Sequence, residues 1–189
     1  MKNKNVYLTE KKFADKRFRK TEDEILKVFF GSKEDLTVRQ VVKETKIARS
    51  TFYRHHLSIG KIIPDYRKYV YLRYVLYMRK KMKKSAHIKT LYMSMLLFIV
   101  QNKRIFTLLV ERDGGIIFTQ MIHKLLPKVE RHIRNAGGAG KIFEIYKSEV
   151  ATILMEWGEE GFREEKIGEV LKNIMYLTDT IYARLGAII

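Results

Sequence analysis

Cysteine is absent from this 189-residue sequence, which excludes a disulfide framework and thiolate zinc sites. It contains two prolines, so long helices can form along most of the chain. Its longest apolar run, Leu91 to Val100, is interrupted by Ser94 and is too short to span a bilayer. No apolar signal segment follows the first residue. These absences predict a cytoplasmic protein that does not insert into a membrane and that can bury its own core.

Positive charge is what the sequence has in excess. It carries 38 Lys and Arg against 21 Asp and Glu, a formal net charge of +17. Residues 1–84 hold +15 of this excess, whereas residues 85–189 hold +2. Solubility requires no such asymmetry, and basic modules most often meet nucleic acid or anionic membrane. The distribution predicts a basic N-terminal module joined to a near-neutral globular one.

Helical periodicity recurs along the whole chain, and no stretch alternates convincingly in the manner of a strand, so we predict an all-α fold. The expected order is a basic arm, a helix, two short helices and then a long helix rich in tyrosine. Three middle helices, a flexible connection and two strongly amphipathic helices complete it. In residue numbers these are 1–13, 14–30, 38–45, 49–56, a long helix from 61, 86–101, 103–111, 115–135 with a bend at Pro127, Gly137–Gly140, and helices spanning Ile142–Trp157 and Ile167–Leu185.

The two short helices carry the most informative pattern. Thr37 is placed to cap the first of them, and Lys46–Ala48 forms a tight break before the second. The second helix is too polar for a core position, although Phe52 would face inward. This is the helix–turn–helix arrangement, in which the second helix lies in the major groove of DNA.

The residue types of this segment suit DNA contact. Arginines supply long cationic donors, Ser and Thr supply short hydroxyls, and Tyr and His rings can reach phosphates. The candidate DNA-binding residues are Thr37, Arg39, Arg49, Ser50, Thr51, Tyr53, Arg54, His55 and Lys61.

The same segment resembles a known family. Thr37-Val38-Arg39, followed by Ile47 and then Thr51-Phe52-Tyr53-Arg54-His55, looks like the TetR family of bacterial transcriptional regulators. The basic stretch 15–21 and the stretches 98–103 and 155–161 are also similar to that family. The resemblance implies a homodimer of about nine helices per subunit that binds a palindromic operator in double-stranded DNA. It favours a repressor over an activator, often with release by a small-molecule inducer, which the sequence does not name.

Carried over by position, the family pattern assigns roles to several residues. Thr37 would cap its helix against a phosphate, Arg49, Ser50 and Thr51 would face bases, and Tyr53 and His55 would contact phosphates. Three features depart from the pattern. They are Ala48 in place of a Ser or Thr cap, Ile59 where a phosphate-binding Lys is frequent, and a short stretch between Phe30 and Thr37.

The resemblance also divides the chain into a DNA-binding domain, 14–60, and a dimerisation and ligand-sensing domain, 61–189. The last two helices have apolar faces broad enough to form a four-helix bundle between two chains. We place the dimer interface at Ile153, Trp157, Ile174 and Ile181. The candidate ligand residues are first of all core, and a cavity among them is left open. They are Tyr92, Met95, Phe98, Phe118 and Met121.

Other functions have weaker support in the sequence. The main alternative is a TetR-fold coactivator that binds proteins and has lost operator binding. No catalytic set has supporting spacing, so we expect no enzyme, cofactor or metal site. Adjacent helical residues point about 100° apart, so His55 and His56 should not share a site; we expect one phosphate contact and one packed or solvated ring. The run Arg79–Lys84 is taken as a solvated helix end rather than an RNA or membrane site. Gly137–Gly140 lacks the strand and the Lys of a phosphate loop.

Overall fold

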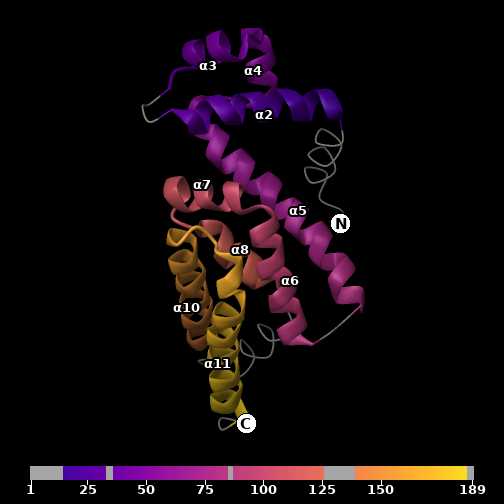
Figure 1. Ribbon diagram of the computed structural model, residues 1–189, viewed down its shortest axis with the longest axis vertical. Helices are drawn as coiled ribbons and strands as arrows, with labels where there is room; N and C mark the ends of the chain where they lie inside the picture. Colours follow the sequence, from indigo (N-terminus) through magenta and orange to yellow (C-terminus); the bar gives the residue numbers. More distant parts are fainter. Residues whose placement is uncertain (1–14, 33–35, 85–86, 126–138, 187–189) are drawn as a thin grey trace. The chain divides into compact units, whose positions relative to one another are not determined.

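The computed structural model describes residues 15–32, 36–84, 87–125 and 139–186, and every regular element in these ranges is helical (Figure 1). The predicted all-α fold is therefore confirmed for this part of the chain. The predicted arm, 1–13, and the predicted bend at Pro127 lie outside the described residues. The chain divides into two compact units, Met1–Leu72 and Arg73–Ile189. We call them the N-terminal unit and the C-terminal unit.

The N-terminal unit is built from short helices. It contains α2 (Lys16–Gly31), α3 (Val38–Thr45), α4 (Arg49–His55), a 3-10 turn (Ile59–Lys61) and the first part of α5 (Ile62–Lys84). Asp15 caps α2 by accepting a hydrogen bond from the Arg17 N–H at 2.8 Å. The helices bury a small apolar core, to which each of α2, α3, α4 and α5 contributes one to three inward side chains. These are Ile25, Leu26, Val41, Phe52, Ile62, Tyr66 and Val70.

The C-terminal unit has a larger core. It contains α6 (Ile88–Gln101), α7 (Lys103–Asp113), α8 (Ile116–Leu125), α10 (Ala139–Glu159), a 3-10 turn (Glu164–Lys166) and α11 (Ile167–Gly186). Helix α10 packs against α11, α8 and α7, and α11 also packs against α6 (Figure 1). Four fully or nearly fully buried rings from four segments meet edge to face or stacked at the centre. They are Phe106, Phe118, Trp157 and Phe162.

A chain of buried hydroxyl groups crosses this apolar core. Tyr92 of α6 is hydrogen-bonded to Tyr146 of α10, whose hydroxyl lies 2.8 Å from the Thr178 hydroxyl of α11. Thr178 donates its single proton to the Ile174 carbonyl at 2.7 Å, so Tyr146 must donate to Thr178. Because the three side chains come from three helices, the chain fixes the register of α6, α10 and α11 at one level.

The predicted element bounds differ from the structure at several ends. The predicted helix 49–56 ends at His55, and the predicted helix 103–111 continues to Asp113. Ala139 and Gly140 belong to α10, whereas we predicted a flexible connection through Gly140. Glycine costs a helix about 1 kcal/mol relative to alanine. A helix that packs against three others can offset that cost. The predicted cap at Thr37 and the predicted bounds of the helix that follows it are confirmed.

No single helix in the described ranges is long and apolar enough to cross a membrane. Helices α6 and α7 pass such a test only as a pair, and they are bent by 88° at the break between them.

Candidate nucleic-acid interface

The N-terminus of α3 is closed by a reciprocal capping box. The Gln40 N–H donates to the Thr37 hydroxyl at 3.3 Å, and the Thr37 N–H donates to the Gln40 side-chain oxygen at 2.8 Å. At the other end, Lys46 adopts a left-handed conformation with φ 55°. This conformation turns the chain sharply, so only three residues separate the end of α3 from the start of α4.

Helix α4 has one buried face and one exposed face. Phe52 is fully buried, whereas Arg49, Ser50 and Arg54 are exposed and Tyr53 is 42% exposed. Thr51 is half-buried beside them. Ala48 precedes α4 and makes no side-chain cap, as its residue type requires. The helix is therefore held by its packed face and by its C-terminal end.

Two arginines on the exposed face of α4 are already oriented by neighbours one turn away. The Arg49 guanidinium lies 3.4 Å from the Tyr53 hydroxyl and 5.7 Å from the centre of its ring. The Arg54 guanidinium donates to the Thr51 hydroxyl at 2.9 Å. Arg39 on α3 and Lys61 in the 3-10 turn are also exposed. All the predicted DNA-binding residues except His55 thus have an exposed or half-buried side chain in which polar atoms can reach outward.

His55 is placed differently from what we predicted. Its side chain is 5% exposed, its Nδ1 lies 2.7 Å from Glu22 Oε2, and its ring stacks on Phe18 with centroids 3.9 Å apart. The adjacent His56 also contacts Glu22, with Nε2 3.0 Å from Oε1. The predicted helix 49–56 wrongly included His56, which lies beyond the helix with φ −134° and ψ 135°, and both rings therefore reach one carboxylate. Helical spacing does not apply to His56.

A second carboxylate completes this buried cluster, which comprises Glu22, His55, His56 and Asp65. His56 Nδ1 lies 3.2 Å from Asp65 Oδ2 on α5. Burial alone would lower the pKa of His56, but Glu22 and Asp65 outweigh it and raise that pKa above its ordinary value. Burial alone would raise the pKa of Glu22, but the hydrogen bonds and charges of His55 and His56 lower it. Among the described residues, no group of three or more His, Cys, Asp or Glu is arranged so that it could hold a metal ion.

Glu22 is the residue that sequence reasoning missed. It lies three and four residues before Ile25 and Leu26, on the apolar stripe of α2, and it is 3% exposed. A carboxylate on such a stripe requires a buried partner. That position was the available signal, and its partners are His55, the last residue of α4, and His56, which follows it.

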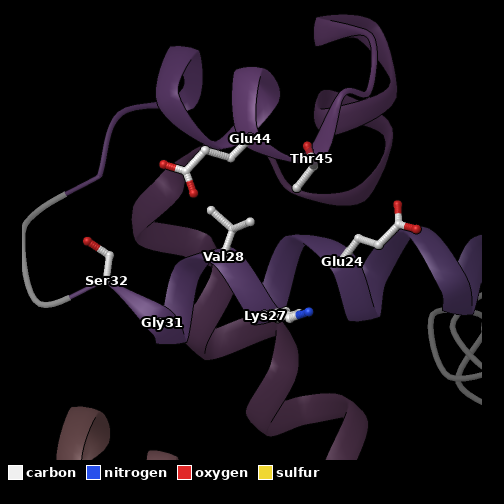
Figure 2. Close-up of a pocket in the computed structure, with 7 residues that line it drawn as sticks. All are labelled: Glu24, Lys27, Val28, Gly31, Ser32, Glu44 and Thr45. Atoms are coloured by element: carbon white, nitrogen blue, oxygen red, sulfur yellow. The ribbon is translucent and has the colours of Figure 1, made fainter.

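Two surface grooves lie away from the predicted ligand residues. Figure 2 shows the larger, about 620 Å³, between the C-terminal parts of α2 and α3. It presents two carboxylates and one lysine, and its lining residues are Glu24, Lys27, Val28, Gly31, Ser32, Glu44 and Thr45. The smaller groove, about 330 Å³, is lined by Val75, Met78, Arg79, Met82, Lys83 and Lys124.

The predicted ligand residues are packed core residues. Each is at most 4% exposed, and each lies in the C-terminal unit. Phe98 contacts the rings of Tyr74 and Phe106, and Phe106 stacks on Phe118. Met121 accepts a hydrogen bond from the Tyr74 hydroxyl through its carbonyl. A ligand would have to displace these contacts to enter.

The predicted dimer residues divide into two pairs. Trp157 is 2% exposed and donates its indole N–H to the Arg163 carbonyl at 2.9 Å, and Ile174 is fully buried. Both side chains are therefore buried by contacts within their own chain and are not accessible to a partner subunit. Ile153 and Ile181 are half-buried.

No protein-family model, curated protein or solved structure matches this chain.

Proposed function

We propose that this protein is a homodimeric, sequence-specific DNA-binding transcriptional regulator in which α4 lies in the major groove. One observation carries the proposal. Helix α4 buries Phe52 and leaves Arg49, Ser50, Tyr53 and Arg54 exposed on the rest of its surface. Long cationic donors and short hydroxyls on one helical face are the groups that contact base edges and phosphates.

The charge of the chain supports the same proposal. Attraction to DNA phosphate is independent of sequence and scales with the number of neutralised phosphates. The N-terminal unit alone has 18 Lys and Arg against 9 Asp and Glu, and the rest of α5 adds six cations and no acid. This excess supplies affinity, whereas selectivity must come from the few side chains on α4.

A dimer would set the distance between two copies of α4. Two recognition helices about 34–36 Å apart match one turn of B-DNA and read a palindrome. Among the side chains of α10 and α11 whose exposure the structure describes, the large apolar ones most open to a partner are Ile145, 59% exposed, and Tyr176, 73% exposed. The hydrogen bond between Tyr146 and Thr178 places them near one level of the helix pair. We therefore propose that the dimer forms through this face, with Ile153 and Ile181 at its edge.

For a small-molecule inducer, the proposal states how it would act and names no compound. A ligand weakens DNA binding if it binds more tightly to a state in which the two recognition helices lie at another separation. The resemblance to the TetR family favours a repressor that is released in this way.

The experiment is selection from a pool of random DNA duplexes. The purified protein is incubated with the pool, the bound fraction is recovered and its sequences are determined. We expect an enriched palindrome with half-sites about one helical turn apart. Binding with no sequence preference at any salt concentration would contradict the proposal and favour the protein-binding alternative.

The dimer face has its own test. Ile145→Glu combined with Tyr176→Glu places charge on the proposed interface, and we expect monomers by light scattering. Ile116→Glu introduces the same charge at an exposed apolar residue of α8, 48% exposed, and serves as the matched control. An unchanged mass in the double variant would place the interface elsewhere.

A further inference from the structure

The His56 ring is enclosed by acceptors on both sides. Its Nδ1 lies 3.2 Å from Asp65 Oδ2, and its Nε2 lies 3.0 Å from Glu22 Oε1. A neutral imidazole has one N–H and one acceptor nitrogen, so it would set a lone pair against one of these carboxylates. Only the imidazolium form, with two N–H groups, suits both. The contact with Glu22 is an ion pair rather than a well-aligned hydrogen bond.

This cluster holds the C-terminal end of α4. His55 is the last residue of α4 and His56 follows it, and their side chains are 5% and 1% exposed. The titratable groups facing the His56 ring are Glu22 from α2, Asp65 from α5 and the neighbouring His55. Since the N-terminal end of α4 lacks a side-chain cap, the cluster and Phe52 hold this helix in place.

We propose that Glu22 is a positioning residue that couples the protonation of His56 to the position of α4 in the N-terminal unit. DNA binding then weakens as His56 loses its proton. The inference rests on the proposed DNA-binding function and names a control of the same site. Loss of the proton leaves the ring with one N–H for two carboxylates, so a lone pair faces either Glu22 or Asp65. With either tautomer, the buried Glu22 carboxylate loses the positive charge of His56 that faced it. Desolvated charge without sufficient partners is costly, and the end of α4 can relieve the cost by moving.

The direction of the pH effect follows from the cluster. The pKa of His56 is raised, so the protonated cluster is complete at and below the ordinary histidine pKa of about 6.5. It is lost as the pH rises through the raised value. The coupling of one proton can change DNA affinity by at most about tenfold per pH unit.

One substitution separates this role from simple structural support. In Glu22→Gln the new amide can accept from His55 Nδ1 through its oxygen and donate to a neutral His56 Nε2 through its NH2 group. His56 can then donate from Nδ1 to Asp65 without an extra proton. The variant should therefore keep α4 in the same position whether or not His56 is protonated. Glu24→Gln, two residues along α2, makes the same chemical change outside the cluster.

The experiment measures two quantities between about pH 6 and pH 9. The first is the titration of the His56 ring and of the α4 backbone amides by NMR, without DNA. The second is the affinity for the selected duplex. In the unchanged protein and in Glu24→Gln, we expect His56 to titrate above its ordinary pKa, α4 amides to shift with it and DNA affinity to fall. In Glu22→Gln, we expect His56 to titrate at lower pH and the DNA affinity to change less steeply.

The outcomes also separate this inference from the proposed function. Equal pH profiles in Glu22→Gln and Glu24→Gln, or α4 amides that ignore His56, would overturn the coupling even if DNA binds. Absence of DNA binding at every pH, with α4 amides still following His56, would contradict the proposed function and leave the coupling standing. If Glu22→Gln fails to fold, His56→Phe provides the second test, since it removes the proton and should leave α4 amides that no longer shift over this range.

Discussion

The two units of this protein solve the burial of polar groups in opposite ways. The C-terminal unit crosses its core with neutral hydroxyls, Tyr92, Tyr146 and Thr178, each hydrogen-bonded to the next. The N-terminal unit instead buries a titratable pair, Glu22 and His56, at the end of a helix of seven residues. Neutral networks are indifferent to pH over the physiological range, whereas a buried histidine pair is not. The difference places the pH-sensitive part of the molecule beneath the proposed DNA-binding helix.

Net charge does not follow the same boundary. The N-terminal unit carries +9, and the C-terminal unit carries +8, with 20 Lys and Arg against 12 Asp and Glu. Six of the cations in the C-terminal unit lie in Arg73–Lys84, the continuation of α5. The large difference in net charge between residues 1–84 and 85–189 therefore coincides with the end of α5 rather than with the boundary between the units. Basic residues of α5 belong to both units.

The largest expected effect tests whether the units are stable separately. Phe52→Ala removes the buried ring of α4, and Phe118→Ala removes a buried ring of the C-terminal unit. Each should cost about 3–5 kcal/mol in its own unit. Hydrogen exchange should show lost protection in α2–α4 for Phe52→Ala, with protection in α10 and α11 retained, and the reverse for Phe118→Ala. Simultaneous loss in both units for either variant would show that they unfold as one.

The buried hydroxyl chain should show the next largest effect. Tyr146→Phe removes its central donor and leaves the hydroxyls on either side with fewer partners. The free energy of unfolding should fall by about 1–3 kcal/mol, as for a buried group left unsatisfied. Thr90→Val, at an exposed position of α6, also removes a hydroxyl and should change it by less than about 0.5 kcal/mol. Urea denaturation of both variants measures these changes. Equal free energies of unfolding in the two variants would show that the hydroxyl chain does not stabilise the core.

Capping of the two short helices gives a smaller pair of effects. Thr37→Ala breaks the capping box of α3 and should cost about 1 kcal/mol. Ala48→Ser supplies α4 with the cap that it lacks and should stabilise the N-terminal unit by up to about 1 kcal/mol. Thermal unfolding followed by helix signals in this unit measures both. A destabilising Ala48→Ser would mean that the backbone before α4 cannot orient a capping hydroxyl.

The smallest perturbation is pH alone. The lowered pKa of Glu22 contributes stability that is lost as pH falls through it, and the raised pKa of His56 contributes stability that is lost as pH rises through it. The cluster should therefore stabilise the N-terminal unit most between about pH 4.5 and pH 6.5. Hydrogen exchange corrected for intrinsic rates should show this maximum in α2 and α4. A maximum of the same shape in α10 and α11 would contradict its assignment to the cluster.

Much of the fold could be predicted from the sequence because local signals agree with it. Thr37, the break at Lys46–Ala48 and the inward Phe52 place α3 and α4 within a residue of where they lie. The amphipathic period likewise identifies α10 and α11, although the start of α10 was missed at Ala139 because its glycines suggested a loop. These signals are contained in a few consecutive residues.

The candidate site was harder to predict because it depends on residues far apart in the chain. Glu22 and His55 are 33 positions apart, and only the packing of α2 against α4 brings them together. Trp157 and Ile174 suit an interface by residue type, but contacts within the chain already bury both side chains. Periodicity indicates which face of a helix is apolar, and it does not indicate which neighbour covers that face.

The central claim is that α4 reads base edges, and paired selections from random duplexes test it most directly. Thr51 lies beside the exposed face and holds the Arg54 guanidinium, whereas Tyr53 presents a phenol that can reach phosphate. Thr51→Ala should change which duplexes are enriched. Tyr53→Phe should weaken binding to all duplexes alike and leave the enriched sequence unchanged. An enriched sequence that is the same for Thr51→Ala as for the unchanged protein would contradict the proposed role of α4.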